Sequence, residues 1–241
     1  MSTKTSDIFT IRAAPGTDIW RKPPTTNIYN APTAIPPSTR STGPLTSFLS
    51  VRASFSFPWR ERYDQAGILL AFRPRHPSSS SSSSLTPSAT SESERKNDIP
   101  PKWIKTGIEF YQSQPQLSTV ATENWADWSV TPLLSSSSSS SSSPGAETEQ
   151  WTTILVEQSA DEHGKSIWVY RIVVDEKTGE EKSRTALREI CWVYGLTNPG
   201  VEEWDLEVVA MAARPEKEIK DGDEKELVVK VKGWEVKWAE E

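Results

Sequence analysis

The sequence predicts an all-β domain in which two antiparallel sheets pack face to face. About ten segments with strand-like alternation are separated by turn residues, and helical signals are sparse. The chain also contains 11 tryptophans in 241 residues, and large aromatic rings are typical of side chains that cover sheet faces. Because β domains of this length are common, we expect residues 1–241 to form a single domain.

The first strand is predicted at residues 8–12, where IFTIR alternates. The next segment, AAPGTDIWRKPP (13–24), is predicted to be an ordered, extended loop, because its prolines prevent a helix. This loop would present Asp18 and Trp20. A tryptophan in such a position more often anchors its loop to a sheet than contacts a ligand.

Two further strands are predicted at residues 48–57 (FLSVRASFSF) and from Tyr63 onward (YDQAGILLAFR). The turn around PWRER would make them antiparallel neighbours. In the second strand, period-two alternation places Tyr63, Gln65, Gly67 and Leu69 on one face and Asp64 on the other. A slip of one residue would exchange Asp64 and Gln65.

The stretch WIKTGIEF (103–110) has the clearest two-faced pattern in the chain. If it is a strand, its inner face carries apolar residues together with a threonine, namely Ile104, Thr106, Ile108 and Phe110. Its other face carries Trp103, Lys105, Gly107, Glu109 and Tyr111. One face therefore resembles a core and the other a site.

Two serine-rich segments, 74–101 and 132–150, interrupt this pattern. They contain runs of seven and nine serines, and we expect disorder because they cannot offset their ordering entropy by burying apolar surface. The strand pattern continues on both sides of each segment. They are therefore predicted to be insertions within one domain rather than linkers between two.

The remaining strands follow at shorter intervals. The alternation predicts them at 116–123, 151–158, 166–174, 190–195, 204–212 and 227–238. The sequence DEKTGEE is typical of a hairpin turn with Gly179 at a position of positive φ. The best helical candidates are a short turn at 198–203 and residues within 182–190.

Composition excludes several classes of function. The formal net charge is −6, and basic residues are not concentrated as nucleic-acid binding requires. No run of 18 apolar residues and no signal peptide is found, so we expect no membrane contact and a cytoplasmic protein. No glycine-rich phosphate loop is present, and His76 and His163 lie in polar loops without partners, so neither a cofactor nor a metal is expected.

The single cysteine, Cys191, excludes an intramolecular disulfide and fits a reducing compartment. Its apolar neighbours Ile190, Trp192 and Val193 predict a thiol in or beside the core rather than a nucleophile.

An ordered set of fragments resembles the DUF1349 family, which includes fungal "regulation of enolase" proteins. The fragments are PGTDIWRKPP (15–24), YDQAGILL (63–70), WIKTGIEF (103–110), LSTVAT (117–122), DWS (127–129) and VVAMAARP (208–215). The resemblance implies a concanavalin A-like jelly-roll β-sandwich and a cytosolic role in carbohydrate use. Such a fold supports both sugar binding and glycoside hydrolysis, so it does not by itself decide function.

Carbohydrate binding needs aromatic faces and a few planar polar groups. The residues that could supply them are Tyr63, Asp64, Gln65, Trp103, Lys105, Glu109, Tyr111 and Asp127, with loop contacts from Asp18 and Trp20. The alternative is a solvated sheet face on which Lys105 and Glu109 pair with other charges.

Glycoside hydrolysis needs two carboxyl groups about 5 to 10 Å apart. Glu109 would have to work with Asp64 or Asp127. The resemblance implies a fold whose glucanases carry a cluster of acids on one strand. In this sequence the corresponding strand has Lys105 and only one acid, Glu109. The missing second acid favours binding over catalysis. A third hypothesis is contact with a protein partner such as a glycolytic enzyme, through exposed tryptophans such as Trp20 and Trp59.

Overall fold

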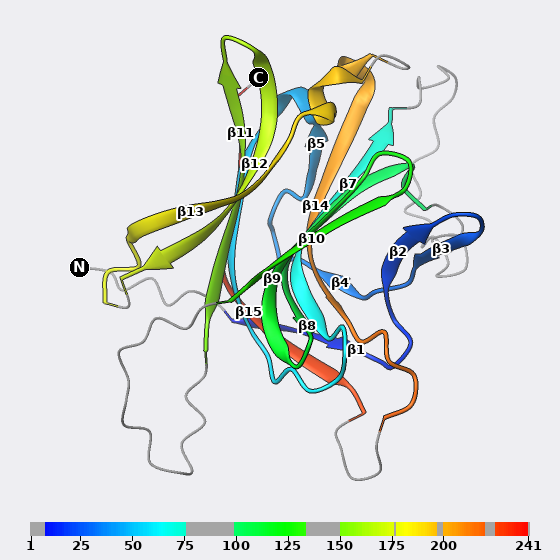
Figure 1. Cartoon of the computed structure of the whole chain (residues 1–241). Helices are drawn as coiled ribbons and strands as arrows, with labels where there is room; N and C mark the ends of the chain where they lie inside the picture. Colours follow the sequence, from blue (N-terminus) through cyan, green and yellow to red (C-terminus); the bar gives the residue numbers. More distant parts are fainter. Residues whose placement is uncertain are drawn as a thin grey trace, which may run out of the picture.

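The structure is a computed structural model that describes residues 8–75, 99–133, 150–175, 177–196, 200–219 and 225–240. Both serine tracts, and with them most of the predicted disordered segments 74–101 and 132–150, lie outside the described residues, as does His76. The predicted all-β sandwich of two antiparallel sheets is confirmed (Figure 1).

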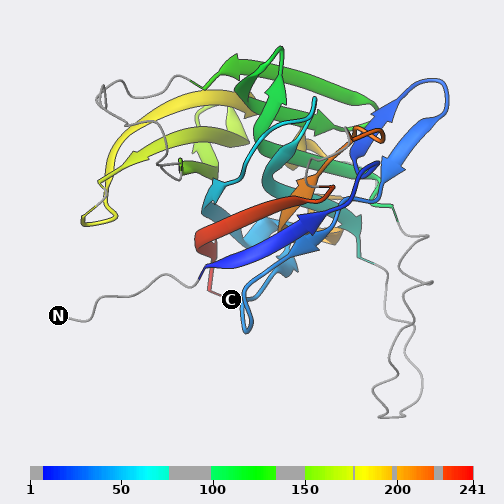
Figure 2. The ribbon, with the colours of Figure 1, turned by 90° about the horizontal axis from the view of Figure 1, so that it is seen from below.

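One sheet has six strands in the order β1-β15-β6-β11-β12-β13. Their bounds are β1 Phe9–Ala13, β15 Leu227–Trp238, β6 Phe48–Ser56, β11 Thr152–Asp161, β12 Gly164–Val174 and β13 Glu181–Ile190. The first and last strands of the chain lie side by side, which Figure 2 shows as blue against red.

The other sheet has seven strands, in the order β10-β9-β8-β7-β14-β4 with β5 also paired to β14. Their bounds are β10 Ala126–Pro132, β9 Gln114–Thr122, β8 Lys102–Tyr111, β7 Gln65–Pro74, β14 Trp204–Ala213, β4 Thr33–Ala34 and β5 Thr42–Pro44. The strand predicted at 103–110 is therefore β8, near the middle of this sheet.

The main core lies between the two sheets. It forms because each central strand turns alternate apolar side chains inward. The seven-stranded sheet contributes Ile68, Leu70, Phe72, Ile104 and Ile108, and the six-stranded sheet contributes Val51, Phe55, Ile154, Val156 and Val229. The predicted inner face of β8 is confirmed by its two isoleucines.

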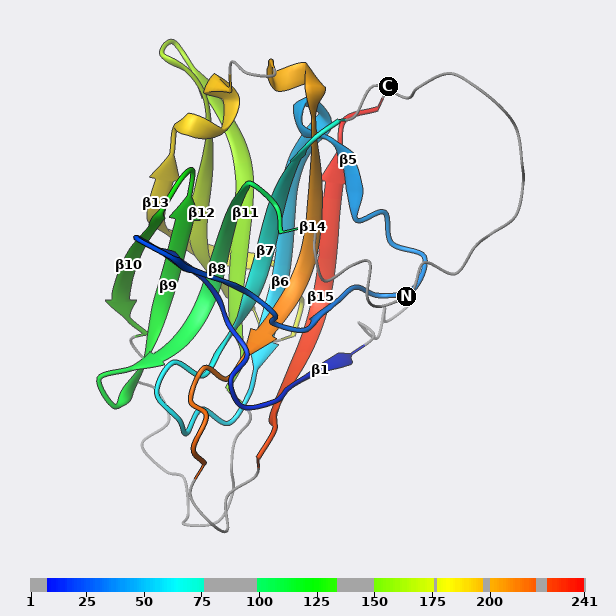
Figure 3. The same ribbon diagram turned by 90° about the vertical axis from the view of Figure 1, so that its right-hand side faces the viewer.

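A short hairpin covers the outer face of the seven-stranded sheet. It consists of β2 (Ile19–Lys22) and β3 (Thr26–Tyr29), and Figure 3 shows it as the dark-blue chain that crosses in front of that sheet. Residues 13–24 were predicted to be an extended loop, and this is corrected in part. Lys22 pairs with Thr26, so the two prolines lie in the hairpin turn.

The predicted pairing of the strands at 48–57 and after Tyr63 is wrong. β6 pairs with β15 and β11, whereas β7 pairs with β8 and β14. The chain between them crosses from one sheet to the other. Both strands are apolar, and local pattern does not tell a hairpin turn from a crossing between layers.

The segment around Cys191 also differs from its prediction. Residues 182–190 are strand β13 rather than a helix, and the chain then forms the 3₁₀ helix η2 (Trp192–Gly195) instead of a strand. Cys191 lies at this change of direction and is exposed rather than buried. Gly179 has φ +73° in the β12–β13 turn, as predicted.

The remaining short elements are the 3₁₀ helices η1 (Leu45–Ser47) and η3 (Val201–Glu203). The second falls within the turn predicted at 198–203. Across the part of the chain that the structure describes, no helix has the length and apolar character needed to cross a membrane.

Candidate functional site

The candidate site lies on the outer face of β8 and its neighbours, under the β2–β3 hairpin. Antiparallel pairing places Gln65 of β7 opposite Glu109, and Glu109 opposite Gln116 of β9. Alternation along β8 turns Lys105 and Glu109 away from the main core, as the sequence predicted. Both are almost completely buried, because the hairpin and an aromatic cluster cover them.

Two facing glycines form the floor of this site. Gly67 and Gly107 are cross-strand partners. A Cβ atom on Gly107 would lie 2.0 Å from the carbonyl oxygen of Ala66, and one on Gly67 would lie equally close to that of Thr106. The two backbones therefore approach too closely for any side chain. The sheet has a shallow depression here, between the polar groups of Gln65, Lys105 and Glu109.

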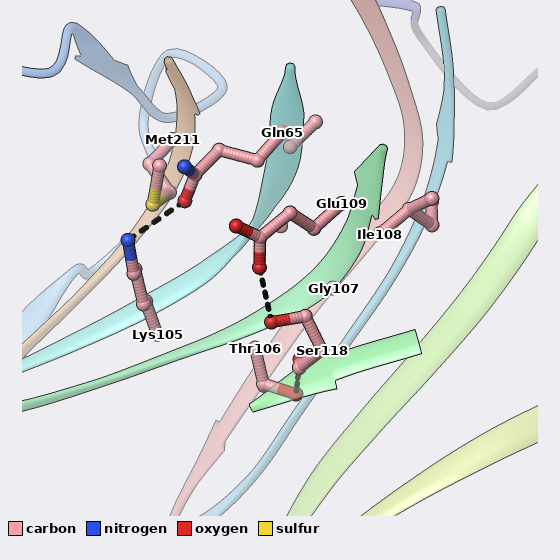
Figure 4. Close-up of a pocket in the computed structure, with 10 residues that line it drawn as sticks. Gln65, Lys105, Thr106, Gly107, Ile108, Glu109, Ser118 and Met211 are labelled. Atoms are coloured by element: carbon pink, nitrogen blue, oxygen red, sulfur yellow. Dashed lines mark hydrogen bonds between the residues drawn. The ribbon is translucent and has the colours of Figure 1, made fainter. Parts of the chain in front are cut away.

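Glu109 is held by one of its two carboxyl oxygens. Ser118 Oγ donates to Glu109 Oε2 at 2.6 Å, and Trp128 Nε1 donates to the same oxygen at 3.0 Å. The other oxygen points toward the space between Gln65 and Lys105 (Figure 4). Burial raises the pKa of Glu109 above its ordinary value, although the Lys105 charge and these two hydrogen bonds lower it. The carboxyl group thus has one hydrogen-bonded oxygen and one oxygen that faces the depression.

Lys105 has a different set of partners. Its Nζ donates to Gln65 Oε1 at 2.8 Å and to Asp18 Oδ1 at 3.2 Å. Gln65 Nε2 also points to the same Asp18 oxygen, at 3.4 Å. Asp18 immediately precedes the hairpin, so the hairpin supplies the counter-ion for a lysine that is only 5% exposed. The loop residue and the sheet residues are brought together as one polar cluster.

An aromatic rim surrounds the cluster on the side of β10. The rings of Tyr63 and Tyr111 stack with centroids 5.6 Å apart, and Trp128 meets Tyr111 edge-on at 5.0 Å. Trp20 of the hairpin meets Trp128 edge-on at 6.4 Å. All four rings are half-buried, so each has both a packed edge and a surface that a ligand can reach.

The depression at the site is small. Its volume is about 10 Å³, between the two glycines, Gln65, Lys105, Glu109 and Met211. A space of this size holds about one water molecule. A larger ligand would therefore lie on the aromatic rim and direct only one small group into the cluster.

We expect Glu109→Gln to change how stability depends on pH. Because burial raises the pKa of Glu109, the folded protein holds this proton more tightly than the unfolded chain does. The stabilisation is complete below the ordinary pKa of 4.5 and is lost as the pH rises through the raised value. Urea unfolding from pH 4 to 8 should show this decline in the wild type but not in the variant. Identical profiles would contradict the prediction, and exposed Glu202→Gln is the control.

Three of the predicted site residues lie away from this cluster. Asp64 is fully buried, and both of its oxygens accept from Arg214 at 2.8 Å. Asp127 lies on the opposite face of β10 from Trp128 and binds Arg188 of the other sheet. Trp103 is 1% exposed and packs with Ile19 under the hairpin. Neither aspartate faces Glu109, and the ring of Trp103 is covered.

Sequence reasoning missed two residues that contact Glu109. Ser118 lies opposite Gly107 on β9, and Trp128 lies opposite Val120 on β10. The pairing register of β8, β9 and β10 would have revealed both, but register depends on contacts between strands rather than on the pattern of any one strand.

A second, wider cleft opens at the edge of the sandwich, where the β9–β10 turn faces the end of β13. Its volume is about 260 Å³, and its lining residues are Ala121, Glu123, Trp125, Asp127, Arg188, Glu189, Ile190, Cys191 and Trp192. Arg188 bridges the sheets here by donating to the Asp127 carboxylate and, at 3.0 Å, to Ser129 Oγ. Among the described residues, no group of three or more His, Cys, Asp or Glu could hold a metal ion.

The protein is a β-sandwich domain with a cluster of buried polar side chains on the outer face of one sheet. The chain belongs to the DUF1349 family, described as proteins of unknown function, which matches residues 1–181. An uncharacterized protein of Emericella nidulans is 34% identical over 186 residues, which make up 77% of this chain and 68% of that protein.

A solved structure shows the same kind of fold. A functionally unknown protein from Saccharomyces cerevisiae matches with a TM-score of 0.51 and 18% identity, over 100% of this chain and 95% of that one. A weaker match is LamAcat from Zobellia galactanivorans, with a TM-score of 0.45 and 9% identity, over 97% of this chain and 77% of that one.

Proposed function

We propose that this protein binds a carbohydrate on the outer face of the seven-stranded sheet. The observation that carries the proposal is the convergence of Gln65, Lys105 and Glu109 beside four half-buried aromatic rings. Planar polar groups suit the hydroxyl groups of a sugar, and aromatic faces suit its apolar side. A cluster serving only stability would not need a carboxyl oxygen directed into a water-sized space.

The dimensions limit how a sugar can bind. The ring would lie against Tyr63, Tyr111, Trp128 and Trp20, because the space between the polar groups holds about one water molecule. One substituent of the sugar would enter this space and contact Glu109. Binding is therefore expected to be selective for the group at a single ring position.

The test is calorimetry with a panel of monosaccharides and oligosaccharides. We expect at least one sugar to bind the wild type. Trp128→Ala should weaken that binding at least tenfold, because the variant removes both a rim surface and a donor to Glu109. Trp168→Ala, on the six-stranded sheet, is the control and should bind normally. No binding by any sugar, with the wild type folded, would overturn the proposal.

Hydrolysis is the second candidate, and one observation favours it. Burial raises the pKa of Glu109, as a general acid requires. The carboxylate whose charge reaches Glu109 is Asp18 rather than Asp64 or Asp127. Hydrolysis would release reducing ends from a polysaccharide, and Glu109→Gln would abolish that release. Binding without release of reducing ends would leave the protein as a binding domain.

Contact with a glycolytic enzyme through Trp20 and Trp59 stays a prediction. Trp20 packs against Trp128, and Trp59 packs edge-on against Phe57 with centroids 5.6 Å apart. Both rings are half-buried, so part of each remains open to a partner.

A further inference from the structure

We propose that the ligand carries a carboxylate, as a uronic acid does, and that Asp18 occupies the place of that carboxylate in the unbound protein. The inference rests on the carbohydrate-binding function proposed above and narrows it to acidic sugars. Three features carry it: the arrangement of donors around Asp18, the burial of Lys105, and the position of Asp18 at the edge of the site.

The donors around Asp18 form a receptor for a carboxylate. Asp18 Oδ1 accepts from Lys105 Nζ at 3.2 Å and from the Ile19 N–H at 2.7 Å, and Gln65 Nε2 approaches it at 3.4 Å. Gln65 Nε2 also donates to the Tyr63 carbonyl at 3.2 Å. Gln65 is oriented for this because its own Oε1 accepts from Lys105 at 2.8 Å. A charged donor and an oriented amide directed at one oxygen bind an anionic acceptor more strongly than a hydroxyl group.

Because Lys105 is buried, replacing the Asp18 carboxylate by a neutral group of a ligand would be unfavourable. If a hydroxyl group displaced Asp18, the ammonium would remain in a covered site without its ion-pair partner. Removing one partner of a buried pair is strongly destabilising. Glu109 is the other acidic group facing the cluster. The Lys105 charge reaches Glu109, but the hydrogen bonds of Glu109 are to Ser118 and Trp128 rather than to Lys105. A ligand carboxylate would preserve the ion pair that Asp18 makes.

Asp18 can leave while the hairpin stays in place. Its backbone N–H donates to Asn30 Oδ1 at 2.7 Å, and its carbonyl accepts from Asn30 N at 3.0 Å. These two backbone bonds do not involve the carboxylate, whose Oδ1 also accepts from the Ile19 N–H at 2.7 Å. That third bond would be broken when the carboxylate leaves. The side chain of Asp18 is 19% exposed, against 6% for Lys105. Rotation about χ1 would turn the carboxylate toward solvent and leave a space of the size that another carboxylate needs.

The experiment measures binding of glucuronate, galacturonate, glucose, galactose and acetate to the full chain by calorimetry. We expect a uronate to bind at least tenfold more tightly than its neutral parent sugar, because a charge-assisted hydrogen bond is about twice as strong as one between neutral groups. Asp18→Asn should tighten uronate binding about fivefold or more, because the variant removes the internal competitor. Lys105→Met should abolish the preference for uronates.

The control variant is Asp205→Asn. Asp205 pairs with Arg75 at 2.7 Å near the other end of the same sheet, so this change also removes one charge and one ion pair. It should leave uronate binding unchanged. If Lys105→Met does not fold, the comparison of Asp18→Asn with Asp205→Asn still decides the question.

The outcomes separate the two proposals. Neutral sugars binding as tightly as uronates, or Asp18→Asn leaving uronate binding unchanged, would overturn the inference but not carbohydrate binding. Acetate binding as tightly as glucuronate would mean that a carboxylate alone is recognised, and this would overturn the acidic-sugar assignment. Failure of every sugar would overturn both.

Discussion

Asp64→Asn is expected to lower the free energy of unfolding by about 3–5 kcal/mol, the usual effect of removing one partner from a buried ion pair. Asp64 is 0% exposed and Arg214 2%. The carboxylate accepts from Arg214 Nε and Nη2, and from the backbone N–H groups of Arg60 and Glu61 at 3.1 Å. The variant would leave the guanidinium buried without its carboxylate. Urea denaturation measures the loss.

The matched control for this change is Asp205→Asn, which breaks an ion pair that is partly exposed to solvent. Pairs at the surface contribute only about 0–1 kcal/mol. Equal losses in the two variants would contradict the view that Asp64 and Arg214 form a structural clamp. Because the pair joins the loop before β7 to the end of β14, its loss should also loosen the nearby chain at Gly16, whose N–H donates to the Arg214 carbonyl at 2.8 Å.

Gly107→Ala is expected to destabilise the protein by about 3 kcal/mol or more, at the upper end of what overpacking costs. The added methyl group would lie 2.0 Å from the carbonyl oxygen of Ala66 and 2.5 Å from the Cα of Gly67. Both contacts are with backbone, so β7 and β8 would have to separate. The separation would also shift Gln65 relative to Lys105. Sugar binding should therefore be lost together with stability.

Gly195→Ala is the control for this variant. A Cβ at Gly195 would have nothing within 4 Å, so we expect a change within about 0.5 kcal/mol. Thermal unfolding of both variants and a titration with the best-bound sugar would check the prediction. A fully stable Gly107→Ala protein would mean that the two strands do not approach as closely as described.

Lys105 differs from a lysine on an ordinary sheet surface because it is shielded from solvent. An exposed lysine would exchange partners freely, whereas this one is covered by the hairpin and has its counter-ion supplied by Asp18. The hairpin therefore supplies the counter-ion of Lys105, in addition to covering apolar side chains such as Ile19.

The strands and most of their faces follow from the amino-acid pattern alone. The period of two along β7 and β8 is a local property of the backbone, so alternation is sufficient to assign Gln65, Lys105 and Glu109 to one face. The terminal strand Leu227–Trp238 was predicted with the bounds that it has in the fold. The same local reasoning failed at Cys191, because the chain turns there into a 3₁₀ helix.

Which of these residues meet depends on the packing of the whole chain. Asp64 and Arg214 are 150 positions apart, and Asp18 and Lys105 are 87 apart. The local sequence therefore does not show which aspartate forms a buried structural ion pair and which lies in the candidate site. The division of β6 and β7 between two sheets likewise depends on how the layers pack. Alternation determines which way a side chain points, whereas its partner is determined by sheet order and register, and these arise from contacts between distant segments.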